Sequence, residues 1–212
     1  MNPPPLRQVW RLTNSRRLAR YRGGLSRGFS MIEVLVSIVV LSFGLLGMVG
    51  LQAAALKNNR DARLQSTAVG FAREMAEMMR ANAAVGALQT NNPYFGDFSG
   101  TGLAPGTTSD CLSVGNTCAN AMSVANAQMT EWLKRVEAGL PGARVSICLD
   151  TAPYDSNGLP QWACTAPTMT QQNIAYIKLG WTRANTQSQL EQAVDSGSRP
   201  FVVLPITPGG QL

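Results

Sequence analysis

Apolar residues dominate one long stretch near the start of the chain. Val34–Leu51 contains no charged side chain, and the uncharged stretch continues to Leu56. At a helical rise of about 1.5 Å per residue, this length spans a bilayer core of roughly 30 Å. A carboxylate, Glu33, lies directly before the stretch, although an ionised acid is costly to place in hydrocarbon. The pattern predicts a membrane-spanning helix with one acid near its start.

The region after Leu56 keeps a helical periodicity. Its apolar side chains recur at spacings of three and four residues, which is typical of one buried stripe on a helix. The stripe consists of Leu64, Ala68, Phe71, Met75 and Met78. We therefore expect one helix from Phe29 to about Asn82. Its membrane-spanning half covers 29–56, and its amphipathic half, over 57–85, must bury the stripe against residues 86–212.

Residues 86–212 begin with an irregular region and a second helix. The segment 86–120 is rich in Gly, Thr, Ser and Asn without a regular period, which predicts a loop. Apolar side chains with helical spacing predict a helix over Asn120–Leu140. Glu131 and Arg135 are four residues apart on this helix, so we expect them to pair.

Three strands follow the second helix. Alternating apolar side chains predict strands over Arg144–Asp150, Asn173–Arg183 and Pro200–Ile206. In the middle strand Ala175, Ile177, Leu179 and Trp181 share one face, and Tyr176 and Lys178 the other. The last strand is expected at a sheet edge because Pro205 cannot donate a ladder hydrogen bond. Sequential strands favour an antiparallel meander. The predicted fold class is therefore α+β, a long N-terminal helix packed on a small antiparallel sheet, plus a second helix.

The net charge of +6 belongs to the N-terminus. Seven of the 18 Lys and Arg residues lie in 1–28, which contains no acid, so residues 29–212 hold 11 bases against 12 acids. This distribution argues against a nucleic-acid surface on the folded domain. It also places residues 1–28 in the cytoplasm and the C-terminal domain on the other side of the membrane, by the positive-inside bias. An organellar targeting peptide shares this composition, but the membrane-length segment that follows disfavours it.

The cysteines indicate disulfides. Cys111, Cys118, Cys148 and Cys164 all follow the membrane-length segment, where an oxidising compartment is expected. Of the three possible pairings, Cys111–Cys118 and Cys148–Cys164 are favoured because each closes a local loop. The chain lacks Cys-x-x-Cys pairs and histidine, so we expect no metal, no cofactor and no histidine-based catalytic site. The segment Asp155–Gly158 resembles part of a calcium loop but is equally typical of a turn.

Processing of the chain has three possible outcomes. Ala53-Ala54-Ala55 fits an ordinary signal-peptide cleavage site, but the apolar region is longer than the 7–15 residues, roughly, of such signals. The chain could also remain an uncleaved anchor. Cleavage after Gly28 would instead create an amine at Phe29, one helical turn from Glu33. The amine of a neighbouring helix could then pair with Glu33.

The segment Arg27–Val36 resembles the class III signal of type IV pilins and pseudopilins. The shared features are a basic leader, Gly28 before the cut, Phe29 after it, Glu33 and an uninterrupted apolar helix. The resemblance covers Arg27–Ala55 and is diffuse afterwards. It implies cleavage between Gly28 and Phe29 by a prepilin peptidase, N-methylation of Phe29, a pilin fold and an assembly contact at Glu33.

Other features of the chain are similar to minor pilins. Gly44–Gln52 and Ile177–Trp181 resemble a group of pilus modification proteins. Gly50 stands where many major pilins carry a proline, and the 28-residue leader is longer than the leaders common in major pilins.

The resemblance implies a non-enzymatic subunit, anchored in the inner membrane by one span with its C-terminal domain in the periplasm, and incorporated into a type IV pilus at the cell surface. The implied partners are prepilin peptidase, other minor pilins, the major pilin and the inner-membrane assembly platform, with a tip adhesin as a further candidate. A minor pseudopilin of a type II secretion system is the alternative. A signal-anchored periplasmic enzyme is a third hypothesis, which the absence of histidine disfavours.

Overall fold

The computed structural model describes residues 28–100, 102–168, 174–184 and 189–207. The leader 1–27, residue 173 of the predicted middle strand and residues 208–212 lie outside this range. The chain forms two units, residues 1–50 and 51–212, and helix α1 contributes to both. The elements are α1 (Met31–Ala81), α2 (Ala83–Gly86), β1 (Gly96–Phe98), α3 (Ala121–Gly139), β2 (Arg144–Leu149), β3 (Ala175–Gly180), β4 (Arg183–Ala184), β5 (Leu190–Glu191) and β6 (Val202–Ile206).

Four strands form an antiparallel sheet in the order β1-β2-β3-β6. Strands β2, β3 and β6 form the predicted meander, with Leu179 of β3 opposite Val145 of β2 and Val202 of β6. The two-stranded β4–β5 hairpin is inserted between β3 and β6. Strand β6 lies at the sheet edge, as Pro205 predicts. The predicted α+β fold class is confirmed.

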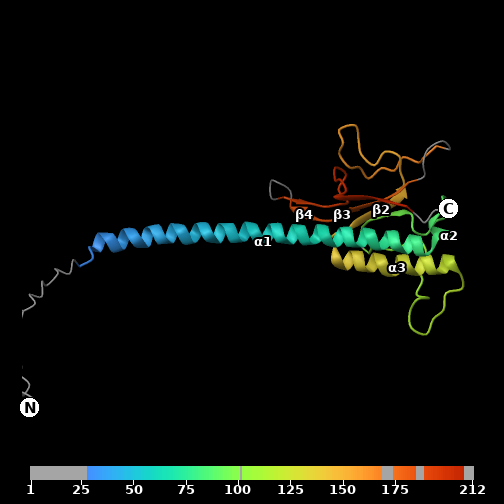
Figure 1. Ribbon diagram of the computed structural model, residues 1–212, viewed down its shortest axis with the longest axis horizontal. Helices are drawn as coiled ribbons and strands as arrows, with labels where there is room; N and C mark the ends of the chain where they lie inside the picture. Colours follow the sequence, from blue (N-terminus) through green and yellow to red (C-terminus); the bar gives the residue numbers. More distant parts are fainter. Residues whose placement is uncertain (1–27, 101, 169–173, 185–188, 208–212) are drawn as a thin grey trace, which may run out of the picture. The chain divides into compact units, whose positions relative to one another are not determined.

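Helices α1 and α3 pack against each other within residues 51–212 (Figure 1). The indole N–H of Trp132 on α3 donates to the backbone oxygen of Phe71 on α1 at 3.2 Å, and the two rings meet edge to face. Arg135 of α3 pairs with Glu74 of α1 at 2.5 Å. The predicted Arg135–Glu131 pair is therefore wrong, because Glu131 pairs with Lys134.

Side chains from both helices and from the sheet form one core. In Figure 1 the strands lie on one side of α1 and α3 lies on the other. The buried positions of α1 are Ala68, Ala72, Met75, Ala76 and Met79. The predicted stripe was correct at Ala68 and Met75. However, Leu64, Phe71 and Met78 are only partly buried at its margin, because Ala72 and Met79 face the core more directly.

Two short elements correct the prediction of a loop over 86–120. Helix α2 ends inside this range, and β1 pairs with β2 as the outermost strand. Arg144 of β2 donates two hydrogen bonds to the carboxylate of Asp97 on β1, at 3.1 and 2.7 Å. The predicted second helix is confirmed, and it begins with Asn120 and Ser123 in a reciprocal capping box.

The loop between β2 and β3 covers the sheet face that the helices leave free. The structure joins Cys148 of β2 to Cys164 of this loop, and Cys111 to Cys118 in the segment before α3, which is the pairing favoured from the sequence. Within the loop, the ring of Trp162 packs on Gly180 so closely that an added Cβ would lie 2.8 Å from it. Lys178, predicted on the face of β3 opposite Ile177, is therefore fully buried under the loop.

We predict that the two disulfides contribute unequally to stability. The sequence separations are 16 residues for Cys148–Cys164 and 7 for Cys111–Cys118. The chain-entropy relation gives about 3 kcal/mol for the longer loop and about 2 kcal/mol for the shorter one. The double substitution Cys148→Ser/Cys164→Ser should therefore lower the free energy of unfolding more than Cys111→Ser/Cys118→Ser. Urea denaturation of the two variants measures the difference, and equal losses would contradict the prediction.

Candidate functional site

The start of α1 positions its acid. Phe29 and Ser30 precede the helix, and the carbonyl oxygen of Ser30 accepts hydrogen bonds from the N–H groups of Glu33 at 3.0 Å and Val34 at 3.2 Å. Glu33 therefore lies in the first turn. The helix dipole favours a carboxylate at this end, so the helix itself supports the charge.

The rest of the apolar segment is exposed in the isolated chain. Every residue from Gly28 to Arg63 is exposed, including Phe29 and the long run of apolar side chains up to Leu56. Among the described residues, α1 contains the one stretch that is long and apolar enough to cross a membrane. Such an exposed surface requires either lipid or other apolar helices around it.

The segment satisfies its hydroxyl groups internally. The Ser37 hydroxyl donates to the backbone oxygen of Glu33 at 2.6 Å, and the Ser42 hydroxyl donates to that of Ile38 at 2.7 Å. Within the described part of the chain, no cation forms an ion pair with Glu33. The Glu33 carboxylate is thus without a counter-ion among the described residues.

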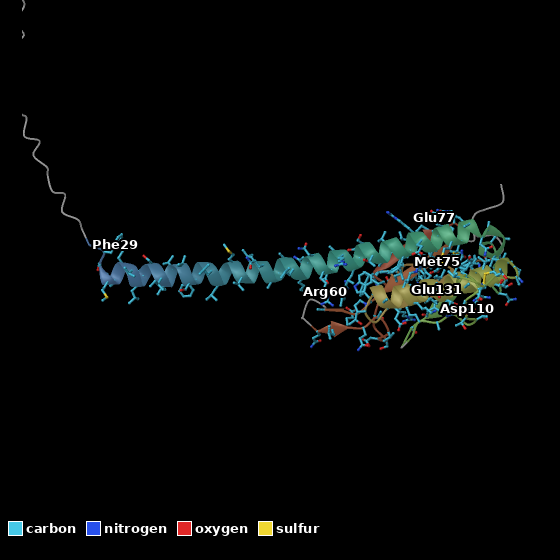
Figure 2. All side chains as sticks on the ribbon, turned by 90° about the horizontal axis from the view of Figure 1, so that it is seen from below. Phe29, Arg60, Met75, Glu77, Asp110 and Glu131 are labelled. Carbon is cyan, nitrogen blue, oxygen red and sulfur yellow. A yellow bond between two sulfur atoms is a disulfide. The ribbon has the colours of Figure 1, made fainter. Side chains whose placement is uncertain are left out.

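Phe29 and Glu33 line the same shallow hollow on α1. Its volume is about 350 Å³, and its lining residues are Phe29, Glu33, Val34, Ser37, Ile38 and Leu41. Apart from Glu33 and the internally bonded Ser37, the lining is apolar. A hollow of this kind could accommodate an apolar helix of another subunit that carries a positive charge at the level of Glu33 along α1. Figure 2 shows Phe29 projecting at the start of the helix.

Three glycines leave open surface further along the same segment. At Gly44, Gly47 and Gly50 an added Cβ would meet nothing within 4 Å. The helix nevertheless continues unbroken through all three positions. Small residues let neighbouring helices approach closely in an apolar environment, so this part of α1 has room for a close helix contact.

The site residues expected from the sequence thus fall into two groups. Gly28, Phe29 and Glu33 lie together at the start of α1, in the unit 1–50. The four disulfide cysteines lie in the unit 51–212, where they stabilise the fold.

Asp150 and Lys178 form a buried ion pair that the sequence did not single out. The Lys178 ammonium donates to Asp150 at 2.5 Å and to the backbone oxygen of Ala163 at 2.6 Å, and both charged side chains are fully buried. The other Asp150 oxygen accepts from the N–H groups of Ala152 and Thr165 at 2.9 Å. Burial raises the pKa of Asp150, but the hydrogen bonds from Lys178, Thr165 and Ala152 outweigh it and hold the pKa below its ordinary value.

This pair also removes the one candidate metal cluster among the described residues. The ligand atoms of Cys148, Asp150 and Cys164 lie within 4.8 Å of one another. Both sulfur atoms are in the disulfide, and the Asp150 carboxylate is already bound by Lys178 and backbone N–H groups. The cluster therefore has no free ligand set for a cation.

The segment Asp155–Gly158 is a turn. The Asp155 carboxylate accepts from the N–H groups of Asn157 at 2.9 Å and Leu159 at 3.0 Å, and it pairs with Arg199 at 2.8 Å. Gly158 has a φ of 75°, the left-handed conformation that favours glycine in turns. The carboxylate is committed to this turn and to Arg199.

Comparison with known proteins identifies one feature of the chain. The prokaryotic N-terminal methylation motif matches residues 25–49. No curated protein and no solved structure shows significant similarity to the chain. The motif covers the site described above, and it supports a structural protein of the type IV pilin type. It implies processing by prepilin peptidase and assembly with other pilins, and together with the apolar helix it supports membrane anchoring.

Proposed function

We propose that this protein is a minor pilin that takes part in the assembly of a type IV pilus. The observation that carries the proposal is the isolated acid of Glu33 in the first turn of an exposed apolar helix, directly after Gly28 and Phe29. After cleavage, the Phe29 amine of one subunit pairs with Glu33 of a neighbour. In lipid an ionised carboxylate is costly, and the pair with a neighbour's amine would offset this cost more fully than the helix dipole does.

In this proposal the subunit is first stored in the inner membrane. Its N-terminus lies in the cytoplasm and residues 57–212 lie in the periplasm, where the two disulfides form. The apolar part of α1 then exchanges lipid for the helices of other minor pilins and the major pilin at the assembly platform. The folded domain becomes exposed on the fibre, where a tip adhesin is a further candidate partner.

Within the minor pilins, we propose the role of PilV, the pilus modification protein, because parts of the chain resemble that group. The similarity lies in Gly44–Gln52 and in Ile177–Trp181, which forms most of β3 and continues one residue beyond it. We propose the same role in pilus initiation and, through it, in twitching motility.

A minor pseudopilin of a type II secretion system would use the same helix and the same acid. Deletion of the gene separates the two functions. Loss of surface fibres and of twitching is expected for a minor pilin. Retention of secreted enzymes inside the cell, with normal fibres, would show that the protein is a pseudopilin instead.

We predict that the mature chain begins at Phe29 and carries a methylated amine. N-terminal sequencing and mass spectrometry of the protein from membranes measure both properties. A strain without prepilin peptidase is the control and should retain Met1. A mature chain that begins at Leu56 would identify an ordinary signal peptide, and Met1 in the normal strain would identify an uncleaved anchor; either result refutes the processing step.

A further inference from the structure

Four basic side chains lie where the uncharged stretch of α1 ends. Lys57 is the first charged residue after Glu33, and Arg60 and Arg63 follow on exposed positions of the helix. Arg183 is the first residue of β4, and it lines one hollow with Asp61 and Gln65 of α1. The β4–β5 hairpin therefore lies beside this part of the helix (Figure 1). We call Lys57, Arg60, Arg63 and Arg183 the juxtamembrane cluster.

Ion pairing distinguishes this cluster from most other cations of the domain. Elsewhere, basic side chains pair with carboxylates at 3.0 Å or less, and these are Arg80, Lys134, Arg135, Arg144, Lys178 and Arg199. Within the described residues, the three α1 members of the cluster have no ion-pair partner. Arg183 reaches Glu191 only at 4.0 Å. Two carboxylates, Asp61 and Glu191, lie near these four cations, so the positive charge is reduced but still in excess and can attract an anionic surface.

An apolar side chain accompanies the charges. Leu190 of β5 lies opposite Ala184 of β4, and its side chain is 75% exposed. The Arg183 guanidinium lies 3.6 Å from the centroid of the Phe201 ring, and the same ring meets Trp181 edge to face. A contact with an aromatic ring holds the cation in place. An exposed apolar side chain beside basic residues is typical of protein surfaces at the lipid–water interface.

We propose that the juxtamembrane cluster and Leu190 bind the anionic phospholipid headgroups of the leaflet from which α1 emerges. The first charge after the uncharged stretch lies at Lys57, so helix geometry brings the cluster to the headgroup layer when residues 34–56 span the bilayer. The contact holds the β4–β5 side of the domain at the membrane surface before assembly. This inference rests on the membrane anchoring in the proposed function and is independent of pilus assembly.

Photo-crosslinking of the full chain in lipid nanodiscs tests the contact. The variant Leu190→benzoylphenylalanine is reconstituted into phosphatidylcholine discs with and without phosphatidylglycerol, and captured lipid is measured by mass spectrometry. We expect strong capture in discs with phosphatidylglycerol, and weak capture without it or at high salt, because salt screens surface charges. Equal capture in the two kinds of disc would show that the basic side chains of the juxtamembrane cluster do not bind anionic headgroups, and would overturn the proposal.

Charge reversal on α1 provides a matched pair of variants. Lys57→Glu/Arg60→Glu should reduce the capture by Leu190→benzoylphenylalanine at least about fivefold for each charge, the factor expected for one basic residue near an anionic surface. Arg73→Glu is the control, because Arg73 is also exposed and lacks an ion pair among the described residues, yet lies about 20 Å further along α1. An equal effect of Arg73→Glu, or crosslinking of position 190 to a second copy of the chain in place of lipid, would refute the proposal.

A second probe separates this inference from the anchoring on which it depends. Val40 lies within the uncharged stretch, so Val40→benzoylphenylalanine should capture lipid acyl chains in either kind of disc. Capture at position 40 without capture at position 190 would refute the headgroup contact and leave the anchoring intact. Failure at position 40 would refute the anchoring itself.

Discussion

Replacing Glu33 by alanine is expected to reduce the number of pili about tenfold or more, while the chain is still cleaved and inserted into the membrane. The reason is that the proposed ion pair between Glu33 and a neighbour's Phe29 amine, which lies away from water, loses one partner. Glu33 lies one turn after Phe29, in the same hollow, and has no ion-pair partner among the described residues of its own chain. Electron microscopy counts the fibres, and twitching zones report their function. Mass spectrometry confirms that the variant is still cut after Gly28.

Two further variants separate the charge of Glu33 from the shape of the hollow. Glu33→Gln keeps the size of the side chain without the charge, so it should resemble Glu33→Ala. Ser37→Ala alters the same hollow but removes a hydroxyl that is bonded to the backbone of its own helix, so it should leave piliation unchanged. Normal piliation with Glu33→Ala would show that Glu33 is not the assembly contact. Loss of cleavage would show that the residue acts at the peptidase instead.

Local periodicity was sufficient to predict the large elements. Helices α1 and α3 and strands β2, β3 and β6 each carry enough repeats to reveal their period, and the structure ends each of them within a few residues of the predicted bounds. The start of α1 could also be predicted, because Gly28, Phe29 and Glu33 are neighbours in the sequence. The partner proposed for Glu33 belongs to another chain and leaves no pattern in this sequence.

Contacts between distant segments were not predictable in this way. Strand β1 has three residues, too few for a period, and it is fixed by pairing with β2 and by the Asp97–Arg144 contact. The sequence of α3 alone could not show that Arg135 pairs with Glu74 of α1 and not with Glu131 of its own helix. The alternation of β3 placed Lys178 on the face opposite Ile177, but it could not show that the β2–β3 loop would cover that face. The one local hint was a lysine within an apolar strand.

Removing one partner of the buried Lys178–Asp150 pair is expected to have the largest effect on stability. Asp150→Ala leaves a buried ammonium without its counter-ion, and such a change costs about 3–5 kcal/mol. This is a large part of the roughly 5–15 kcal/mol that holds a domain folded. Lys178→Met should act similarly, because Asp150 stays buried and the loop loses the hydrogen bond to Ala163. Urea denaturation of the full chain in detergent measures both losses.

An exposed pair provides the control for this prediction. Lys134 and Glu131 are 3.0 Å apart, with more than half of each side chain exposed. Lys134→Met makes the same chemical change as Lys178→Met, yet it should cost less than about 1 kcal/mol, because solvent already screens the pair. The double variant Asp150→Ala/Lys178→Met should be more stable than Asp150→Ala, since no unpaired charge remains. A double variant no better than Asp150→Ala would show that the pair acts through packing and not through charge.

The same pair gives the domain an acid-sensitive step. The pKa of Asp150 is lower in the folded protein than in the unfolded chain, where an aspartate has a pKa of about 3.9. The contribution of the Asp150 carboxylate to the free energy of unfolding is therefore complete above about pH 4. It is lost as the pH falls through the folded pKa, because the unfolded chain binds the proton more readily than the folded protein does. In Asp150→Asn this loss is absent, so its free energy of unfolding should fall less steeply below about pH 4 than that of the unmodified protein. If the free energy of unfolding falls equally steeply below about pH 4 in the two proteins, other carboxylates control the acid unfolding.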